Sequence, residues 1–177
     1  FKKYLISDDE TILNVNDPNE YMINLQSITS KGSSYWDALY IFAKPENSSD
    51  NLTVHEKQLI EKGYNYFFRM KGKLSYPLLQ SIINLLEVIE TRFDVEEIKK
   101  LSIRQNKNCP DLIKVHQKIQ ELNLEDLTKL LNSKRIQNSK AKNTYVNAIK
   151  SINISSLNYE ELTLDEIRYL GWAIGVK

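Results

Sequence analysis

The sequence predicts a mainly α-helical fold, an irregular multi-helix bundle with a short N-terminal β-hairpin. Apolar residues recur at three- and four-residue steps along most of the chain, the spacing that places side chains on one face of a helix. Ser, Thr, Asp or Asn followed three residues later by an acidic residue repeatedly precedes these runs, as at helix starts. With 177 residues, the chain is long enough to bury a core without a disulfide or metal.

Residues 1–15 are expected to form the hairpin, because two short extended pieces flank a polar turn. The first helix is expected from Asp17, since Pro18 suits the first helical position and Glu20 completes a capping box. Gly32 is expected to end this helix.

Two aromatic-rich helices are predicted next. One begins at Ser34 and stops at Pro45, and the polar segment 45–52 is expected to be a loop. The other begins at the capping box 53–56 and continues to Gly72. Core packing is the expected role of their aromatic residues, with a base-stacking platform as the alternative. These residues are Trp36, Tyr40, Phe42, Tyr64, Tyr66, Phe67 and Phe68.

The longest apolar-periodic run, residues 76–101, is expected to organise the fold. Pro77 suits its first helical turn, and Asp94 with Glu97 is expected to cap a second, shorter helix. The predicted buried stripe comprises Leu78, Leu79, Ile82, Ile83, Leu86, Ile89 and Phe93, widened by Leu85 and Val88.

Two helical subdomains are expected, an aromatic-rich one over 16–103 and a basic one with an acidic tail over 104–177. The polar, basic segment 102–108 is the expected boundary between them. Beyond it, helices are expected to begin at Pro110, Asn123, Ser139 and Thr163.

The net charge of +1 conceals an uneven distribution of charge. Residues 1–98 hold 10 basic and 15 acidic side chains, residues 99–150 hold 12 and 4, and residues 151–177 hold 2 and 4. A basic block of this kind is typical of a surface that meets phosphates. The alternative is a lysine-rich helical face that only keeps the protein in solution.

Residues 124–152 contain a short Leu-rich helix, a polar link and a second helix, the order found in helix-turn-helix DNA-binding proteins. The link 132–138 is longer than the customary turn and lacks glycine. An ordinary antiparallel helix pair with a basic exterior is therefore the alternative. The residues expected at phosphates are Lys134, Arg135, Lys140, Lys142 and Lys150, and those expected nearest the bases are Asn143 and Tyr145.

Several common chemistries lack their motifs. The five glycines are scattered, so neither a phosphate-binding loop nor a dinucleotide-binding motif is present. His55 and His116 belong to no zinc-binding motif, and Cys109 lies two helical turns from His116, too far for a thiol–imidazole pair. Residues 97–99 match the core of a nuclease motif but lie in a predicted helix. We expect no metal, no cofactor and no catalytic set.

No apolar run approaches the roughly 20 residues that span a bilayer, and the lone Cys109 cannot form an internal disulfide. A cytoplasmic location without membrane contact is therefore expected. Because the chain opens at Phe1, we expect a part of a larger protein. The predicted function is that of a non-enzymatic helical binding module whose basic portion contacts nucleic acid. The alternatives are a scaffold domain that binds a partner helix through its aromatic half, and an accessory domain of a nucleic-acid-processing or phage-defence enzyme.

Overall fold

The computed structural model describes residues 17–48, 51–104, 109–154 and 158–176, and this part of the chain is mainly helical, as predicted. The predicted hairpin of residues 1–15 lies outside the described residues. The first helices are α2 (Pro18–Thr29), α3 (Ser34–Phe42), α4 (Pro45–Ser48), α5 (Val54–Gly63), the π-helix η1 (Tyr64–Phe68), α6 (Tyr76–Arg92) and α7 (Val95–Lys99). The later ones are α8 (Leu112–Glu121), α9 (Leu124–Leu131), α10 (Lys134–Gln137), α11 (Lys142–Ile154), the 3₁₀-helix η2 (Tyr159–Glu161) and α12 (Leu164–Ala173).

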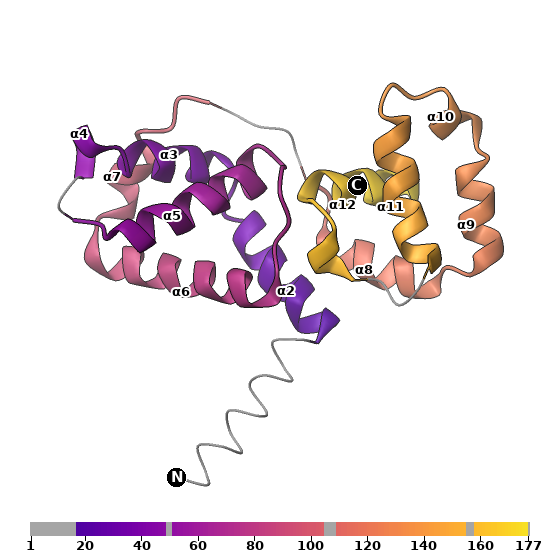
Figure 1. Cartoon of the computed structure of the whole chain (residues 1–177), viewed down its shortest axis with the longest axis horizontal. Coiled ribbons are helices and arrows are strands. Elements are labelled where there is room, and N and C mark those ends of the chain that lie inside the picture. Colours follow the sequence, from indigo (N-terminus) through magenta and orange to yellow (C-terminus); the bar gives the residue numbers. More distant parts are fainter. Residues whose placement is uncertain (1–16, 49–50, 105–108, 155–157, 177) are drawn as a thin grey trace, which may run out of the picture.

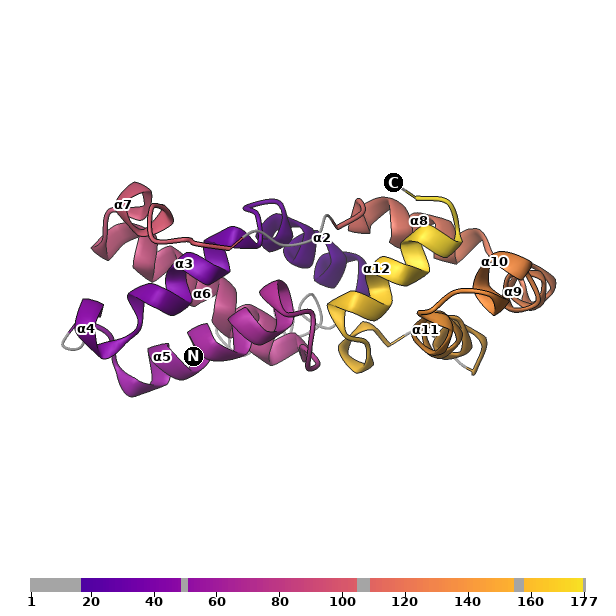
Figure 2. The ribbon, with the colours of Figure 1, turned by 90° about the horizontal axis from the view of Figure 1, so that it is seen from above.

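The helices form two groups along the long axis of the molecule (Figures 1 and 2). Helices α3 to α7 lie at one end, α8 to α12 lie at the other, and α2 lies between them. None of the described helices combines the length and the apolar character needed to cross a membrane.

Side-chain caps fix where many helices start. Capping boxes form as predicted at Thr53 with Glu56, Asn123 with Asp126, and Thr163 with Glu166. At the start of α2, the Asp17 carboxylate accepts from the Asn19 N–H at 2.9 Å, where the sequence predicted a capping box with Glu20. Asp94 also caps α7 as predicted, accepting a hydrogen bond from the Glu96 N–H. The Glu97 carboxylate pairs with Lys100 at 3.0 Å. The sequence had predicted that this carboxylate would instead accept from the Asp94 backbone N–H.

Three boundaries differ from the predicted ones. Helix α8 starts after Pro110 because the Asp111 carboxylate accepts the hydrogen bonds of its first turn. Helix α11 starts after Ser139 because that hydroxyl accepts from the Ala141 N–H and holds a turn there. The predicted loop 45–52 contains the one-turn helix α4.

Helix α5 continues directly into the π-helix η1, where the sequence predicted an α-helix to Gly72. The Arg69 N–H donates to the Tyr64 carbonyl, five residues back, at 3.1 Å. Met70 (φ 59°) and Gly72 (φ 81°) then adopt left-handed backbone conformations. These two residues end the helix and turn the chain toward α6.

The aromatic residues of α3 and η1 pack in the core, as predicted. Trp36 stacks on Phe67 with 5.2 Å between ring centroids, and Tyr40 stacks on Tyr64 at 4.2 Å. Gly63 lies directly against the indole, since a Cβ built there would be 2.2 Å from Cζ3 of Trp36. The absence of a side chain at this position therefore allows α5 to approach α3 closely.

Helix α6 buries Leu79, Ile82, Leu85, Leu86 and Ile89, mainly against α5 and α2. Val88 was expected in this stripe but is 39% exposed. The main contacts of the later helices involve α8, α11 and α12. Helix α6 thus packs on α5 and α2, whereas α3 contacts η1, α7, α5 and α4. The first group is therefore centred on α3 rather than on the predicted run, and the second group has a packing centre of its own.

The segment predicted as a boundary is held against α3 where it begins. Asp37 is only 2% exposed, and its carboxylate accepts from the N–H groups of Ile103 at 2.9 Å and Arg104 at 3.1 Å. The Ser102 hydroxyl donates to the same oxygen at 3.3 Å. These hydrogen bonds offset the cost of burying the carboxylate. The remainder of the segment, 105–108, lies outside the described residues.

Helix α2 joins the two groups through partly buried polar contacts. Gln26 Oε1 accepts from the Leu112 N–H at 2.5 Å. Asn19 Oδ1 lies 2.6 Å from His116 Nε2, and the Tyr159 hydroxyl meets His116 Nδ1. Burial lowers the pKa of His116. A neutral ring with its proton on Nε2 can donate to Asn19 and accept from Tyr159 at Nδ1, and Gln120 Nε2 lies 3.1 Å from His116 Nε2.

Candidate nucleic-acid interface

The basic residues that the sequence predicted at phosphates lie on α10, on α11 and in the turn between these helices. Figures 1 and 2 place these helices, with α9, at the end of the molecule remote from α4 and α7. From Leu127 to Tyr159 the sequence contains no acidic residue. The stretch from Leu127 to Tyr159 therefore combines cationic side chains with an absence of carboxylates.

A buried isoleucine anchors α10 in the link between α9 and α11. Ile136 is 1% exposed, and the Ser133 hydroxyl caps the turn by accepting from the Ile136 N–H at 3.4 Å. Helices α9 and α11 contact each other and α10 contacts both. The link thus contains a helical turn of its own, in place of the short turn of a standard helix-turn-helix.

Helix α11 has one buried face and one exposed face. Tyr145, Ala148 and Ile149 are buried, and α11 packs mainly against α12. The exposed residues on the opposite face are Lys142, Asn143, Asn147 and Lys150. Steps of 3.6 residues per turn place these four within about half of the helix circumference. Cations and amides therefore share one surface.

The cations of this surface have no internal counter-charge. Lys134, Arg135, Lys140, Lys142 and Lys150 are all exposed. Within the described chain none of these five residues forms an ion pair, whereas Lys129 on α9 pairs with Glu125 at 3.5 Å. Their charge is therefore available to an external anion.

Tyr145 was predicted to lie nearest the bases, but it packs inside the protein. Its side chain is 6% exposed, and its ring meets the Tyr169 ring edge-on at 4.9 Å and 72°. A ring covered in this way offers no face to a base. Tyr145 thus lies beneath the candidate interface and supports α11 on α12.

Sequence reasoning did not identify Arg168 as a buried cation. It is 1% exposed, its guanidinium pairs with the Asp165 carboxylate, and it lies 4.9 Å from the centroid of the Trp172 ring. The only sequence signal is the three-residue spacing from Asp165 on a helix. Because Arg168 is covered by the protein, it does not contribute to the exposed basic surface.

No cluster of metal-binding side chains occurs among the residues described by the structure. Burial raises the pKa of Cys109 to about 12, so at neutral pH it is a thiol rather than a nucleophilic thiolate. Cys109 and His116 are therefore accounted for by packing and hydrogen bonding.

Comparison with known proteins adds no assignment to this geometry. The chain matches no family model, no curated protein and no solved structure.

Proposed function

We propose that this protein binds nucleic acid through the exposed surface of α10, α11 and the turn between them. The observation that carries the proposal is the set of five exposed cations, Lys134, Arg135, Lys140, Lys142 and Lys150, which form no ion pair within the described chain. Lysine and arginine side chains that are not neutralised within the protein attract the phosphate groups of a nucleic-acid backbone.

The salt dependence of binding follows from the number of cations. Each phosphate contact to duplex lowers the slope of log K against log salt concentration by about 0.9. If all five cations meet phosphates, the slope is about −4.5. Affinity then falls steeply as salt is raised, and this fall gives the proposal a quantitative test.

The two exposed amides provide a route to base recognition. Asn143 and Asn147 lie on the same face of α11 as Lys142 and Lys150. A helix of about 10–12 Å diameter fits the major groove, which is about 12 Å wide. There an asparagine side chain pairs with the N6 and N7 atoms of adenine. The lysines would position α11 on the backbone while the amides contact base edges.

The test replaces Lys134, Arg135, Lys140 and Lys142 together with Ala. Helicity and thermal stability are expected to stay near wild type, because exposed charges contribute little to stability. Duplex affinity at low salt is expected to fall steeply, and the salt slope becomes shallower by about 3.6. The measurement is a fluorescence-anisotropy titration with duplex and single-stranded oligonucleotides at two salt concentrations.

A matched control removes the same charges from the other group of helices. Lys44, Lys62, Arg69 and Lys71 are also exposed and also comprise three lysines and one arginine. The quadruple alanine variant at these positions is expected to keep the wild-type slope. An equal loss in both variants contradicts a localised interface, and a wild-type protein that binds no oligonucleotide at low salt refutes the proposed function.

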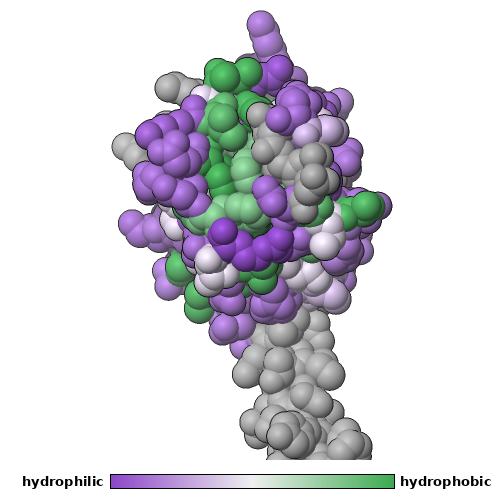
Figure 3. Space-filling model, turned by 90° about the vertical axis from the view of Figure 1, so that its left-hand side faces the viewer, coloured by the Kyte–Doolittle hydropathy of each residue, from purple (hydrophilic) through white to green (hydrophobic). Residues whose placement is uncertain are grey.

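A second candidate function, docking of a partner helix, is favoured by an apolar groove at the opposite end. Figure 3 shows apolar side chains exposed between hydrophilic ones on this end. The groove, about 300 Å³ in volume, is lined by Phe42, Phe93, Ile98 and Leu101 together with the carboxylates Asp94 and Glu97. These features suit an amphipathic helix with basic flanks. If no nucleic acid binds, and a basic amphipathic peptide binds in a manner abolished by Phe93→Ser, this function takes first place.

A further inference from the structure

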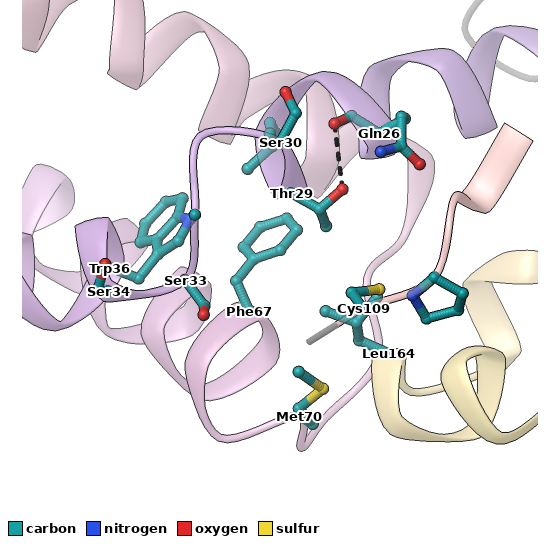
Figure 4. A pocket seen from close by; sticks show the side chains of 13 residues that line it. Gln26, Thr29, Ser30, Ser33, Ser34, Trp36, Phe67, Met70, Cys109 and Leu164 are labelled. Atoms are coloured by element: carbon teal, nitrogen blue, oxygen red, sulfur yellow. Dashed lines mark hydrogen bonds between the residues drawn. The ribbon is translucent and has the colours of Figure 1, made fainter. Parts of the chain in front are cut away.

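A pocket of about 420 Å³ lies at the junction of the two groups of helices (Figure 4). It is formed by the end of α2, the start of α3, η1, the residues before α8 and the start of α12. Apolar side chains in its wall include Ile28, Trp36, Phe67, Met70 and Leu164. Hydroxyl groups within residues 29–34 line another part of it. Its volume is within the range of small-molecule sites.

Among the residues that the structure describes, no lining residue carries a formal charge. Gln26 already accepts a hydrogen bond from the Leu112 N–H, and Cys109 is a partly buried, protonated thiol. A charged ligand in this pocket would lose hydration without gaining a counter-charge. The lining therefore favours a neutral molecule.

One buried donor in the pocket wall lacks a partner. Trp36 is 1% exposed, and its Nε1–H has no hydrogen-bond acceptor within the described part of the chain. The Cζ3 edge of its indole lies against Gly63. Nε1 is on the other side of the indole, and Figure 4 shows this nitrogen turned toward the other labelled side chains of the pocket. A buried donor without an acceptor is costly, so a ligand acceptor at this position would be stabilising.

We propose that this pocket binds a small neutral molecule of one or two rings that carries a carbonyl or ring-nitrogen acceptor. The acceptor takes the Trp36 Nε1–H, and the apolar body of the ligand packs against Phe67, Met70 and Leu164. The start of α3 lies at the same pocket, and a helix N-terminus favours the negative end of a carbonyl dipole. The site is separate from the basic surface of α10 and α11, so it is independent of the proposed function.

The test uses the Trp172→Phe variant, in which Trp36 is the single remaining tryptophan. Three single-ring probes are titrated, namely the neutral benzamide, the anion benzoate and the cation benzylammonium. Benzamide is expected to shift the Trp36 indole N–H resonance and to change Trp36 fluorescence, saturating with a Kd on the order of 1 mM. The two charged probes are expected to bind at least tenfold more weakly, because the lining offers no counter-charge.

Two serine variants, made in the same background, complete the test. Ser34 lines the pocket and is only partly buried, so Ser34→Leu is expected to obstruct the pocket, leave the far-UV circular dichroism unchanged, and weaken benzamide binding at least tenfold. Ser27 is exposed on α2 and does not line the pocket, so Ser27→Leu is the matched control and keeps the affinity. The proposal is overturned if benzamide leaves the indole N–H resonance unmoved, if the three probes bind equally, or if Ser34→Leu binds like Ser27→Leu.

Discussion

The two groups of helices differ in what they bury and in what they expose. In α3 and η1 the core consists of stacked rings such as Trp36 on Phe67 and Tyr40 on Tyr64. In α11 and α12 the core is largely aliphatic, with Ile149 and Leu170 fully buried. Exposed carboxylates border the apolar groove at the first end, and unpaired cations cover the other. Core type and local surface charge therefore change together along the chain.

The two groups are nevertheless linked by partly buried polar contacts. His116 on α8 binds Asn19 on α2 and Tyr159 on η2, and Asp37 on α3 holds the start of the segment that leads to α8. We therefore expect both groups to unfold in a single cooperative transition.

The largest effect is expected from truncating one fully buried residue in each group. Ile82→Ala in α6 and Ile149→Ala in α11 should each lower the free energy of unfolding by about 2–5 kcal/mol, because both leave a cavity. Urea denaturation is followed by circular dichroism and, in Trp172→Phe backgrounds, by Trp36 fluorescence. Coincident transitions support one cooperative unit, and separate midpoints would show that the groups unfold independently. Ile23→Ala, at a side chain 50% exposed, is the control, with a loss below about 0.5 kcal/mol.

A smaller effect is expected from adding one methyl group at a close contact in each group. Gly63→Ala places a Cβ 2.2 Å from a Trp36 ring carbon, and the rigid indole cannot yield, so a loss of about 1–3 kcal/mol is expected. Gly171→Ala meets Val115 at 2.8 Å and Pro110 at 2.9 Å. Part of that cost is offset by the better helix propensity of alanine, so a loss of at most about 1 kcal/mol is expected. Thermal unfolding measures both, and a larger loss at Gly171 would show that the aliphatic group is the more rigidly packed one.

The smallest effect is a pH dependence located at the joint. Because burial lowers the pKa of His116, the unfolded chain binds this proton more readily than the folded protein does. Stability from this group is thus fully present above the unfolded pKa of about 6.5 and is lost as pH falls through the folded pKa. The urea midpoint of the wild-type protein is expected to be lower at pH 5.5 than at pH 7.5, and this difference is expected to be smaller for His116→Gln. The control is His55→Gln, at an exposed position, which should show the same change of midpoint with pH as the wild type. If His116→Gln also shows the wild-type change, the pH dependence does not come from His116.

Features that depend on neighbours in the chain were predictable from the sequence. The capping boxes at 53–56 and 163–166 need only a hydroxyl and a carboxylate three residues apart, and both form. The α6 stripe follows from helical periodicity, and five of its predicted residues are buried. Of the other predicted residues, Leu78, Ile83 and Phe93 are partly buried and Val88 is exposed. By contrast, the Asp37 carboxylate accepts from an N–H 66 residues away, at Ile103. No local pattern reports such a contact.

The candidate basic surface shows the same limit. Charge counting located its cations, because exposure is the usual state of lysine and arginine. It could not separate Tyr145, which is buried on Tyr169, from Asn143, which is exposed two residues earlier. That distinction depends on how α11 is rotated about its axis against α12. The pocket depends in the same way on five separate segments meeting in space.

The π-helix η1 determines how the aromatic core responds to a change in chain length. Its hydrogen bonds span five residues rather than four, so it holds an extra residue relative to an α-helical path. A one-residue deletion within Tyr64–Phe68 would remove that extra residue and let the helix continue with α-helical spacing, so the side chains on both sides of the deletion would keep their directions. A one-residue deletion within Val54–Gly63 has no extra residue to remove, and it would rotate one side of the helix relative to the other by about 100°. A single-codon deletion is therefore expected to be tolerated better in η1 than in α5.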